Sequence, residues 1–531
     1  MIDTLIRNGM VIDGTGAAAE VKEVAISQGK IISAQGQDKP EAMQEIDAKG
    51  KVVCPGFIDI HSHSDFTLLV NRNAESAIHQ GITTLVTGNC GHGPAPCRDK
   101  ELAKQVTIGY SDNWETDISW NSFGQYVNNL FSPGLAVNVA PLVPHGAIRM
   151  AVMGYDERKP SRVELDEMKA MVAEAMSAGA AGFSTGLEYS PGQYAEKEEL
   201  IALTSVAARH GGIYASHIRN RADTFLEAVE EALTIIREAG LPGQLSHLAP
   251  RPYANGQFQD VLTAIDDATG QEGLMVGIDT FPDIWAPGPA VTLLPSWVYE
   301  GNQDEVISRL ASKDVLDRCR DAILNPTNYL LRLGGFESFY LTCSKSFPEL
   351  VGKNFQEISN IFSLDPAETI FKLVRADGAD FYNVMLRHIY ATEEDLKTLL
   401  LQSNCSIESD GVTAAPYGHL RHFVFNRASY GYTIRFLQEY ILEKELFTLE
   451  EGIRRLTSLP ADSAGLINRG RIAAGCAADL VMLDLEQMAD RTTDDSPQAY
   501  PAGIEMVMVN GEIVLDHDRH TLVLPGQLLP D

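Results

Sequence analysis

Short apolar runs alternate with amphipathic stretches along most of this chain. Apolar runs without polar alternation end near residues 60, 87, 143, 184, 216, 246, 281 and 409, and helical patterns such as 163–177 and 224–239 lie between them. Strands of this kind, separated by helices, are typical of a parallel sheet that is covered on both faces. Eight such units predict an α/β fold, a (β/α)8 TIM barrel, with reactive groups at the carboxyl ends of its strands.

Both ends of the chain show a different pattern, in which short apolar strands are separated by turns. Asn8-Gly9 and Asp13-Gly14 lie between apolar runs near the start, and Asn510-Gly511 does so near the end. Dipeptides of this type are strong turn signals. We therefore expect residues 1–54 and 470–531 to form one small β-sandwich-like domain beside the barrel.

The barrel is expected to occupy residues 55–469, with an interruption. The segment from about 285 to 400 is too long for one barrel loop and carries helical patterns of its own at 303–311 and 313–323. It predicts an inserted subdomain.

Charge excludes several classes of partner. The 531 residues include 42 Lys and Arg against 72 Asp and Glu, a formal net charge of −30. An acidic surface disfavours both nucleic acid and anionic membranes, and no apolar run approaches the roughly 18 residues of a membrane span. The chain has seven scattered cysteines and no signal-peptide pattern at its start, so we expect a cytoplasmic protein that acts on a small molecule. A homo-oligomer is compatible with the sequence.

The sharpest chemical feature is P-G-F-I-D-I-H-S-H at residues 55–63. Side chains alternate along a strand, so His61 and His63 point to the same side, and imidazole is a common ligand of Zn²⁺. Two surface histidines at a strand end would be the simpler interpretation. Three further polar residues, His217, His247 and Asp410, each follow a predicted strand. Because those strand ends meet at one mouth of a barrel, the pattern predicts a metal site.

These motifs resemble the amidohydrolase superfamily, and several others narrow the resemblance. G-I-T-T-L-V-T-G-N-C-G around Cys90, A-G-F-S-T-G-L-E-Y, A-S-H-I-R-N and A-A-D-L-V-M-L-D are similar to the N-acyl-D-amino-acid deacylase (D-aminoacylase) family. The resemblance implies a zinc held tightly by Cys90, His217 and His247. It also implies a second, weaker metal position among His61, His63 and Asp410, with Asp410 as general base and acid.

The resemblance also implies substrate-binding residues, and here the chain departs from the family. Tyr189 and Arg427 match family positions, whereas Ala249 replaces a family lysine that holds the substrate carboxylate. Arg251, two residues later, could supply the missing cation, or it could be a surface arginine.

Three other residues are candidates for the pocket wall. Asp283 and Trp285 stand where the family has a tyrosine- and serine-containing motif, which suggests a bulkier, cationic or aromatic substrate. His145 is expected either to line the pocket or to make structural hydrogen bonds.

Three functions follow from these observations. The first is zinc-dependent hydrolysis of the amide bond of an N-acyl amino acid. The second is hydrolysis of another amide, a lactam or a cyclic amide in an altered pocket. The third is a non-catalytic scaffold like the dihydropyrimidinase-related proteins, against which the retention of every ligand-type residue argues.

Overall fold

Eight parallel strands form the central sheet, and their spatial order follows the sequence. They are β8 (Phe57–Asp59), β9 (Ile82–Thr87), β10 (Asn138–Pro144), β11 (Gly182–Gly186), β12 (Ile213–His217), β13 (Gly243–Leu245), β14 (Val276–Thr280) and β18 (Cys405–Ile407). Beyond the last strand, Ser62 pairs with Gly411 in parallel, and this contact joins β8 to β18. The predicted TIM barrel is confirmed.

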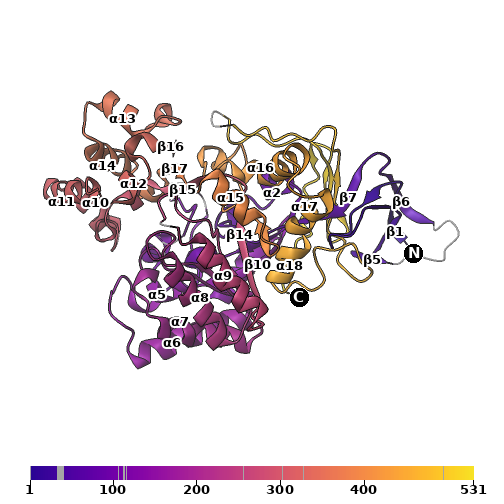
Figure 1. Cartoon of the computed structure of the whole chain (residues 1–531), viewed down its shortest axis with the longest axis horizontal. Helices are drawn as coiled ribbons and strands as arrows, with labels where there is room; N and C mark the ends of the chain where they lie inside the picture. Colours follow the sequence, from indigo (N-terminus) through magenta and orange to yellow (C-terminus); the bar gives the residue numbers. More distant parts are fainter. Residues whose placement is uncertain are drawn as a thin grey trace.

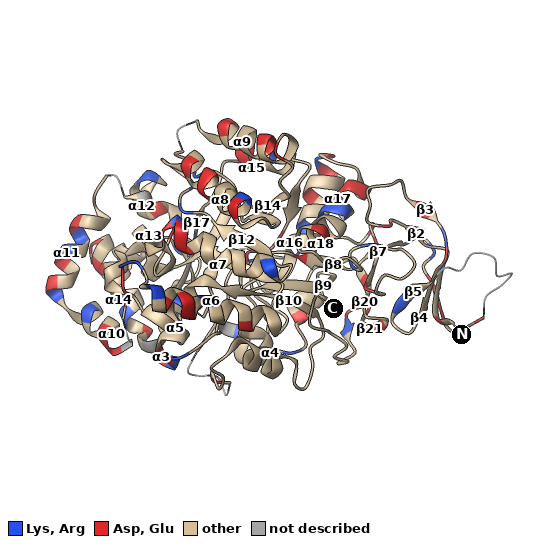
Figure 2. Ribbon diagram, turned by 90° about the horizontal axis from the view of Figure 1, so that it is seen from below, with Lys and Arg blue, Asp and Glu red and all other residues tan. Residues whose placement is uncertain are grey.

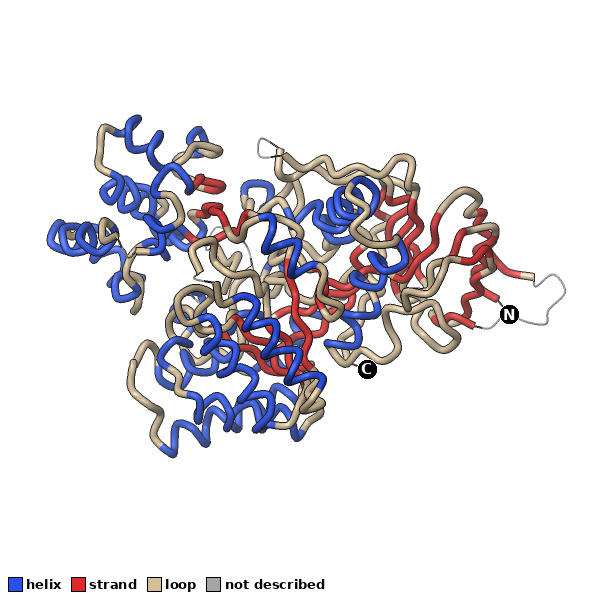
Figure 3. The backbone as a smooth tube through the Cα atoms, viewed as in Figure 1, coloured by secondary structure: helices blue, strands red, loops and turns tan. Residues whose placement is uncertain are grey.

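This computed structural model describes residues 2–32, 41–105, 107–111, 114, 116–254, 256–301, 303–326, 328–493 and 496–530. Helices surround the barrel strands (Figures 1 and 3). They include α1 (Thr67–Val70), α2 (Glu75–Ile78), α3 (Lys100–Gln105), α4 (Phe123–Phe131), α5 (His145–Met153), α6 (Arg162–Ser177), α7 (Lys197–Arg209), α8 (Phe225–Ala239), α9 (Phe258–Gly270), α15 (Glu393–Leu400), α16 (Ala428–Arg435), α17 (Leu449–Leu456) and α18 (Ser458–Ser463).

Local sequence explains where these helices begin and end. Ser161 caps α6 in a capping box with Glu164, so two backbone N–H groups at the helix start are satisfied. Gly240 ends α8 in the left-handed conformation, which costs glycine little. The apolar face of α8, with Val229 and Leu233, is buried in the barrel core. Because such helices pack against every strand, the carboxyl ends of the strands are held in fixed positions.

Strands from both ends of the chain form two further sheets. The first has the order β5-β4-β1-β6, and the second has the order β22-β21-β20-β19-β7-β2-β3. Apolar residues of both sheets share one core. The strands are β1 (Ile2–Arg7), β2 (Met10–Val11), β3 (Glu20–Val21), β4 (Val24–Ser27), β5 (Lys30–Ile32), β6 (Ala42–Asp47), β7 (Val52–Pro55), β19 (Leu480–Leu483), β20 (Ile504–Val509), β21 (Glu512–Asp516) and β22 (Arg519–His520).

The chain between β14 and β18 leaves the barrel and forms a subdomain at the opposite end of the molecule from the N-terminus (Figure 1). Its core draws on residues from Ala290 to Leu386, whereas α15 packs in the barrel core. A small sheet of order β15-β17-β16 connects it to the barrel. Its elements are β15 (Trp285–Pro289), α10 (Gln303–Ala311), α11 (Lys313–Ile323), α12 (Tyr329–Arg332), β16 (Phe339–Cys343), α13 (Phe355–Phe362), α14 (Pro366–Ala376) and β17 (Met385–Ile389).

Acidic and basic residues are interspersed along the outer helices (Figure 2). Within the described part of the chain, every helix is too short or too polar to cross a membrane.

Candidate metal centre

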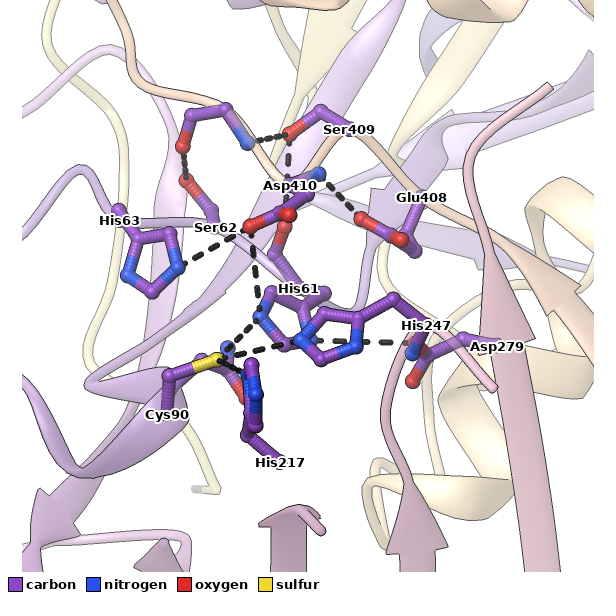
Figure 4. A network of polar contacts seen from close by, with 12 residues as sticks. His61, Ser62, His63, Cys90, His217, His247, Asp279, Glu408, Ser409 and Asp410 are labelled. Carbon is purple, nitrogen blue, oxygen red and sulfur yellow. Dashed lines mark hydrogen bonds and ion pairs between the residues drawn. The ribbon is translucent and has the colours of Figure 1, made fainter. Parts of the chain in front are cut away.

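The predicted ligand residues all follow barrel strands at the same end of the sheet. His61 and His63 come after β8, and Cys90 lies in the short 3-10 turn Asn89–Gly91 after β9. His217 is the last residue of β12, and His247 follows β13. Parallel strands carry these positions to one mouth of the barrel, and the side chains converge there (Figure 4).

Backbone bends aim three of these side chains toward one another. Cys90, His247 and Asp410 have φ values of 54°, 34° and 39°, in the left-handed region that residues with a Cβ rarely adopt. Each bend of this kind costs on the order of 1–3 kcal/mol and persists where the surrounding structure enforces it. Three of the eleven non-glycine residues with positive φ in the described part of the chain thus lie at this one site.

A thiol surrounded by three imidazoles forms the first part of the site. The Sγ atom of Cys90 lies 3.2 Å from His61 Nε2, 3.4 Å from His247 Nε2 and 3.6 Å from His217 Nδ1. All four side chains are buried. Sulfur and imidazole nitrogen are the ligands that Zn²⁺ prefers.

A carboxylate and two imidazoles form the second part. Asp410 Oδ1 lies 3.2 Å from His63 Nε2 and 3.8 Å from His61 Nε2, so His61 belongs to both groups. Burial tends to raise the pKa of Asp410, but hydrogen bonding from His63 and the nearby imidazoles bring this pKa down to about 2. The backbone N–H of Asp410 donates to Glu408, which holds the backbone at this position. Asp410 is therefore an ionised base at neutral pH.

Three of the histidines, His61, His217 and His247, are neutral at pH 7. Burial lowers the pKa of His61 to about 3 and also lowers the pKa values of His217 and His247. His217 Nε2–H donates to Glu188 Oε2 at 2.8 Å, which leaves Nδ1 as a lone pair directed at Cys90. A carboxylate on the far nitrogen is the usual partner of a metal-bound histidine.

The centre contains several acid groups whose pKa values are raised because burial disfavours their ionised forms. Burial raises the pKa of Asp59 and of Asp279 to about 7, and it raises the pKa values of Glu408 and Cys90 well above their ordinary values. A divalent cation among these groups would offset the cost of ionising them. The donor atoms and the excess of acid groups thus both fit a metal ion.

The predicted substrate residues lie beside this centre, but each has a protein partner. Tyr189 donates its hydroxyl to the Cys90 carbonyl at 2.7 Å. Arg251 donates to Glu188 at 3.0 Å and contacts His388 Nε2 at 3.0 Å. Arg251 is thus directed toward the metal centre rather than toward bulk solvent, and its side chain is only 11% exposed.

Asp283, Trp285 and Arg427 line one cavity of about 60 Å³. Phe425 also lines it and packs against His63, with ring centroids 6.0 Å apart. Asp283 accepts hydrogen bonds from Arg427 at 2.7 Å and from Arg435 at 3.1 Å. The negative charge that suggested a cationic substrate is therefore already paired.

The segments of the chain that match a known family correspond to the barrel and its neighbouring strands, without the inserted subdomain. Residues 44–286 and 386–515 match the amidohydrolase family, and the stretch between them coincides with the inserted subdomain. An N-acyl-D-glutamate deacylase from Alcaligenes xylosoxydans xylosoxydans is 33% identical over 96% of this chain and 93% of its own length. This chain belongs to the amidohydrolase family.

Other members of the family are similar to this amidohydrolase over its full length. A D-aminoacylase from Alcaligenes xylosoxydans xylosoxydans is 30% identical over 99% of this chain and 97% of its own. The crystal structure of an N-acyl-D-glutamate deacylase from Bordetella bronchiseptica, complexed with zinc and a phosphonate mimic of the tetrahedral intermediate, has a TM-score of 0.81. It is 29% identical, with 99% of both chains covered. A D-aminoacylase with a binuclear metal centre has a TM-score of 0.82 at 29% identity and the same coverage.

One residue that the sequence offered for the pocket wall, His145, does not line this cavity. His145 is fully buried, and its Nε2 lies 2.9 Å from Glu199, which also pairs with Arg149. These contacts favour the structural role of His145 over the pocket role. Its side chain belongs to a buried ion-pair network, the structural alternative that the sequence left open.

The amidohydrolase centre also contains residues that sequence reasoning missed. Asp279, at the end of β14, accepts from the His247 N–H at 2.6 Å and from the Gln244 side chain at 2.7 Å. Arg221 donates to the His247 carbonyl at 2.9 Å. Asp279 could have been found, because a polar residue at the carboxyl end of a barrel strand is the signal that singled out His217. Arg221 lies on a loop, and the sequence carries no comparable signal for it.

Proposed function

We propose that this amidohydrolase cleaves the amide bond of N-acyl amino acids, with N-acyl-D-amino acids as its substrate class. The convergence of one thiol, four imidazoles and an ionised aspartate at the mouth of the barrel carries the proposal. The names of the relatives, N-acyl-D-glutamate deacylase, N-acyl-D-aspartate deacylase and D-aminoacylase, support the choice of substrate class.

In this proposal, Zn²⁺ is held tightly by Cys90, His217 and His247. A second and weaker metal position involves His61, His63 and Asp410. Cys90 Sγ lies 3.6 Å from His217 Nδ1 and 3.4 Å from His247 Nε2, and the donor atoms of His61, His63 and Asp410 lie within 4.8 Å of one another, which supports this assignment. His61 also lies within this distance of Cys90 and His247, so it would feel the charge of either ion.

Bound Zn²⁺ would polarise the scissile carbonyl and lower the pKa of water to about 7. Asp410 then accepts a proton from the attacking water and returns it to the leaving nitrogen. His63 holds the aspartate oxygen in place at 3.2 Å.

Three residues are assigned to substrate binding. Arg251 is joined to the Cys90 cluster through Glu188, to which it donates at 3.0 Å, and we assign it to the substrate carboxylate in place of the absent lysine. Tyr189 flanks His217, with ring centroids 5.0 Å apart, and closes one side of the centre. Trp285 forms part of the apolar wall of the cavity beside Phe425. Arg427 and Asp283 pair with each other in that wall and shape it without a free charge on either residue.

The test measures whether the purified, zinc-loaded protein hydrolyses matched N-acetyl D- and L-amino acids, neutral N-acetyl amides, and cyclic amides. Preferential cleavage of the D-amino acid derivatives is expected. Cleavage confined to lactams or cyclic amides would replace the proposal with the second function. Less than about 0.3 metal ion per chain together with no hydrolysis would support a scaffold.

We place the protein in the cytoplasm, which its seven free, buried cysteines support. Assembly into a homo-oligomer stays a prediction.

A further inference from the structure

A chain of polar contacts leads from the inserted subdomain to the Cys90 cluster. His388, on β17 of the small sheet, contacts Arg251 Nη1 at 3.0 Å, and Arg251 Nη2 donates to Glu188 Oε1 at 3.0 Å. The other carboxylate oxygen of Glu188 accepts from His217 at 2.8 Å, and His217 faces Cys90. Glu188 therefore lies between the positively charged Arg251 and the candidate metal ligand His217, and it accepts a hydrogen bond from each through a different carboxylate oxygen.

Glu188 fixes both the orientation and the tautomer of His217. A carboxylate at Nε2 keeps the proton there and leaves Nδ1 unprotonated toward the cluster. Glu188 is itself charged, because although burial opposes ionisation, the cations of Arg251 and Arg221 hold its pKa well below the usual range. Arg221 Nη2 lies 3.7 Å from the same carboxylate.

The inserted subdomain meets the metal centre at a second point. Tyr390, directly after β17, donates its hydroxyl to the His247 carbonyl and accepts the N–H of Ala249 at 3.0 Å. Burial lowers the pKa of His388 to about 3, so this imidazole is neutral and Nε2 can accept a hydrogen bond from Arg251. One short segment of the insertion, His388 to Tyr390, therefore contacts the supports of two candidate ligands, His217 and His247.

We infer that Glu188 is a positioning residue for His217, and that through Arg251 and His388 it couples metal binding to the docking of the inserted subdomain. The inference rests on the proposed metal role of His217. Because such coupling is a free energy shared by two sites, it acts in both directions. Loosening the subdomain weakens metal binding, and metal binding tightens the subdomain against the barrel.

The first measurement is zinc affinity by competition with a chromogenic chelator. Glu188→Gln keeps an oxygen for His217 but loses the ion pair with Arg251, and Glu188→Ala loses both. Removal of such a partner typically weakens metal affinity by roughly 10–100-fold. We expect the larger loss in Glu188→Ala, a smaller loss in Glu188→Gln, and a loss in Arg251→Met although that side chain is separated from the cluster by Glu188.

Replacing zinc by cobalt gives a measurement that a general loss of stability would not change. The thiolate-to-cobalt absorption band reports the geometry at Cys90, and it should shift in Glu188→Gln at full occupancy. Hydrogen exchange of the backbone of β17 supplies the reciprocal readout. In the wild-type protein zinc should slow exchange there, and this slowing should be reduced in Arg251→Met.

Arg320→Met is the matched control, because Arg320 forms ion pairs with Asp365 and Glu368 within the inserted subdomain and away from the barrel. It should leave zinc affinity and the cobalt spectrum unchanged. Wild-type zinc affinity and spectrum in folded Glu188→Gln and Arg251→Met would overturn the inference while leaving the proposed hydrolase intact. A wild-type protein that binds no metal would overturn both.

Discussion

Replacement of Asp410 by Asn isolates the charge of the proposed base. The amide has nearly the same shape as the carboxylate and keeps an oxygen that can accept from His63, which lies 3.2 Å away. The backbone hydrogen bond from residue 410 to Glu408 does not involve the side chain and should persist. The substitution therefore removes one ionised group with little else changed.

The expected loss follows from what a positioned base contributes. Wild-type Asp410 has a pKa of about 2, so it is fully ionised above pH 5 and available as a base. General base catalysis typically contributes about 10²–10⁴-fold in rate, equivalent to roughly 2.7–5.5 kcal/mol of activation free energy. We expect kcat to fall by that factor in Asp410→Asn. The tight zinc should remain, because Cys90, His217 and His247 are unchanged.

The assay is release of free amino acid from the best N-acyl substrate, with zinc content measured by mass spectrometry on the same preparation and the fold checked by circular dichroism. Retention of more than a tenth of wild-type kcat would remove Asp410 from the base role. Loss of the tight zinc together with activity would instead show that Asp410 is needed for metal binding, and the rate could not then be assigned to proton transfer.

Three further outcomes are expected. Cys90→Ala should lose the tightly bound zinc, since the thiol lies within 3.6 Å of all three imidazoles around it; unchanged zinc content would make the thiol structural. Asp283→Ala should destabilise the protein by about 1.5–3 kcal/mol in denaturant unfolding, because it removes the buried acceptor of hydrogen bonds from the partly exposed Arg427 and Arg435; an unchanged unfolding free energy would contradict this. In metal-free protein the pKa of Asp279 is raised to about 7, so its contribution to stability is present below pH 4 and is lost as pH rises toward 7. Asp279→Asn should flatten the fall in unfolding midpoint over that window, and an unaltered pH profile would argue against the raised pKa.

Hydrophobic periodicity was sufficient to predict most of the fold. The predicted helices at 303–311 and 313–323 coincide with α10 and α11, and the helix predicted from 224 to 239 is α8 with one residue fewer. Each of these elements has one apolar face, Ser312 caps the start of α11 and Gly240 ends α8, so local sequence determines these limits. The strands were located within a few residues, because a short buried run ends gradually.

The candidate ligands could be predicted for the same reason, since they follow strands whose ends must converge in a barrel. The contacts of Arg251 and Asp283 could not be predicted from the sequence. Arg251 meets His388, and Asp283 meets Arg427, across 137 and 144 residues of sequence respectively. Such pairs depend on how the insertion and the loops pack in three dimensions, and no local pattern records that packing.

The junction between β8 and β18 has a consequence for how the protein acquires its centre. Ser409 donates to Asp59 at 2.6 Å across a sequence separation of 350 residues, and it is here that the barrel closes. A contact of such long range carries a large loop-closure entropy and tends to form late. During synthesis, His61 and His63 therefore leave the ribosome long before Asp410 exists to join them. A nascent or truncated chain that ends before β18 lacks Asp410, so occupancy of the second, weaker metal position would report that the whole barrel has closed.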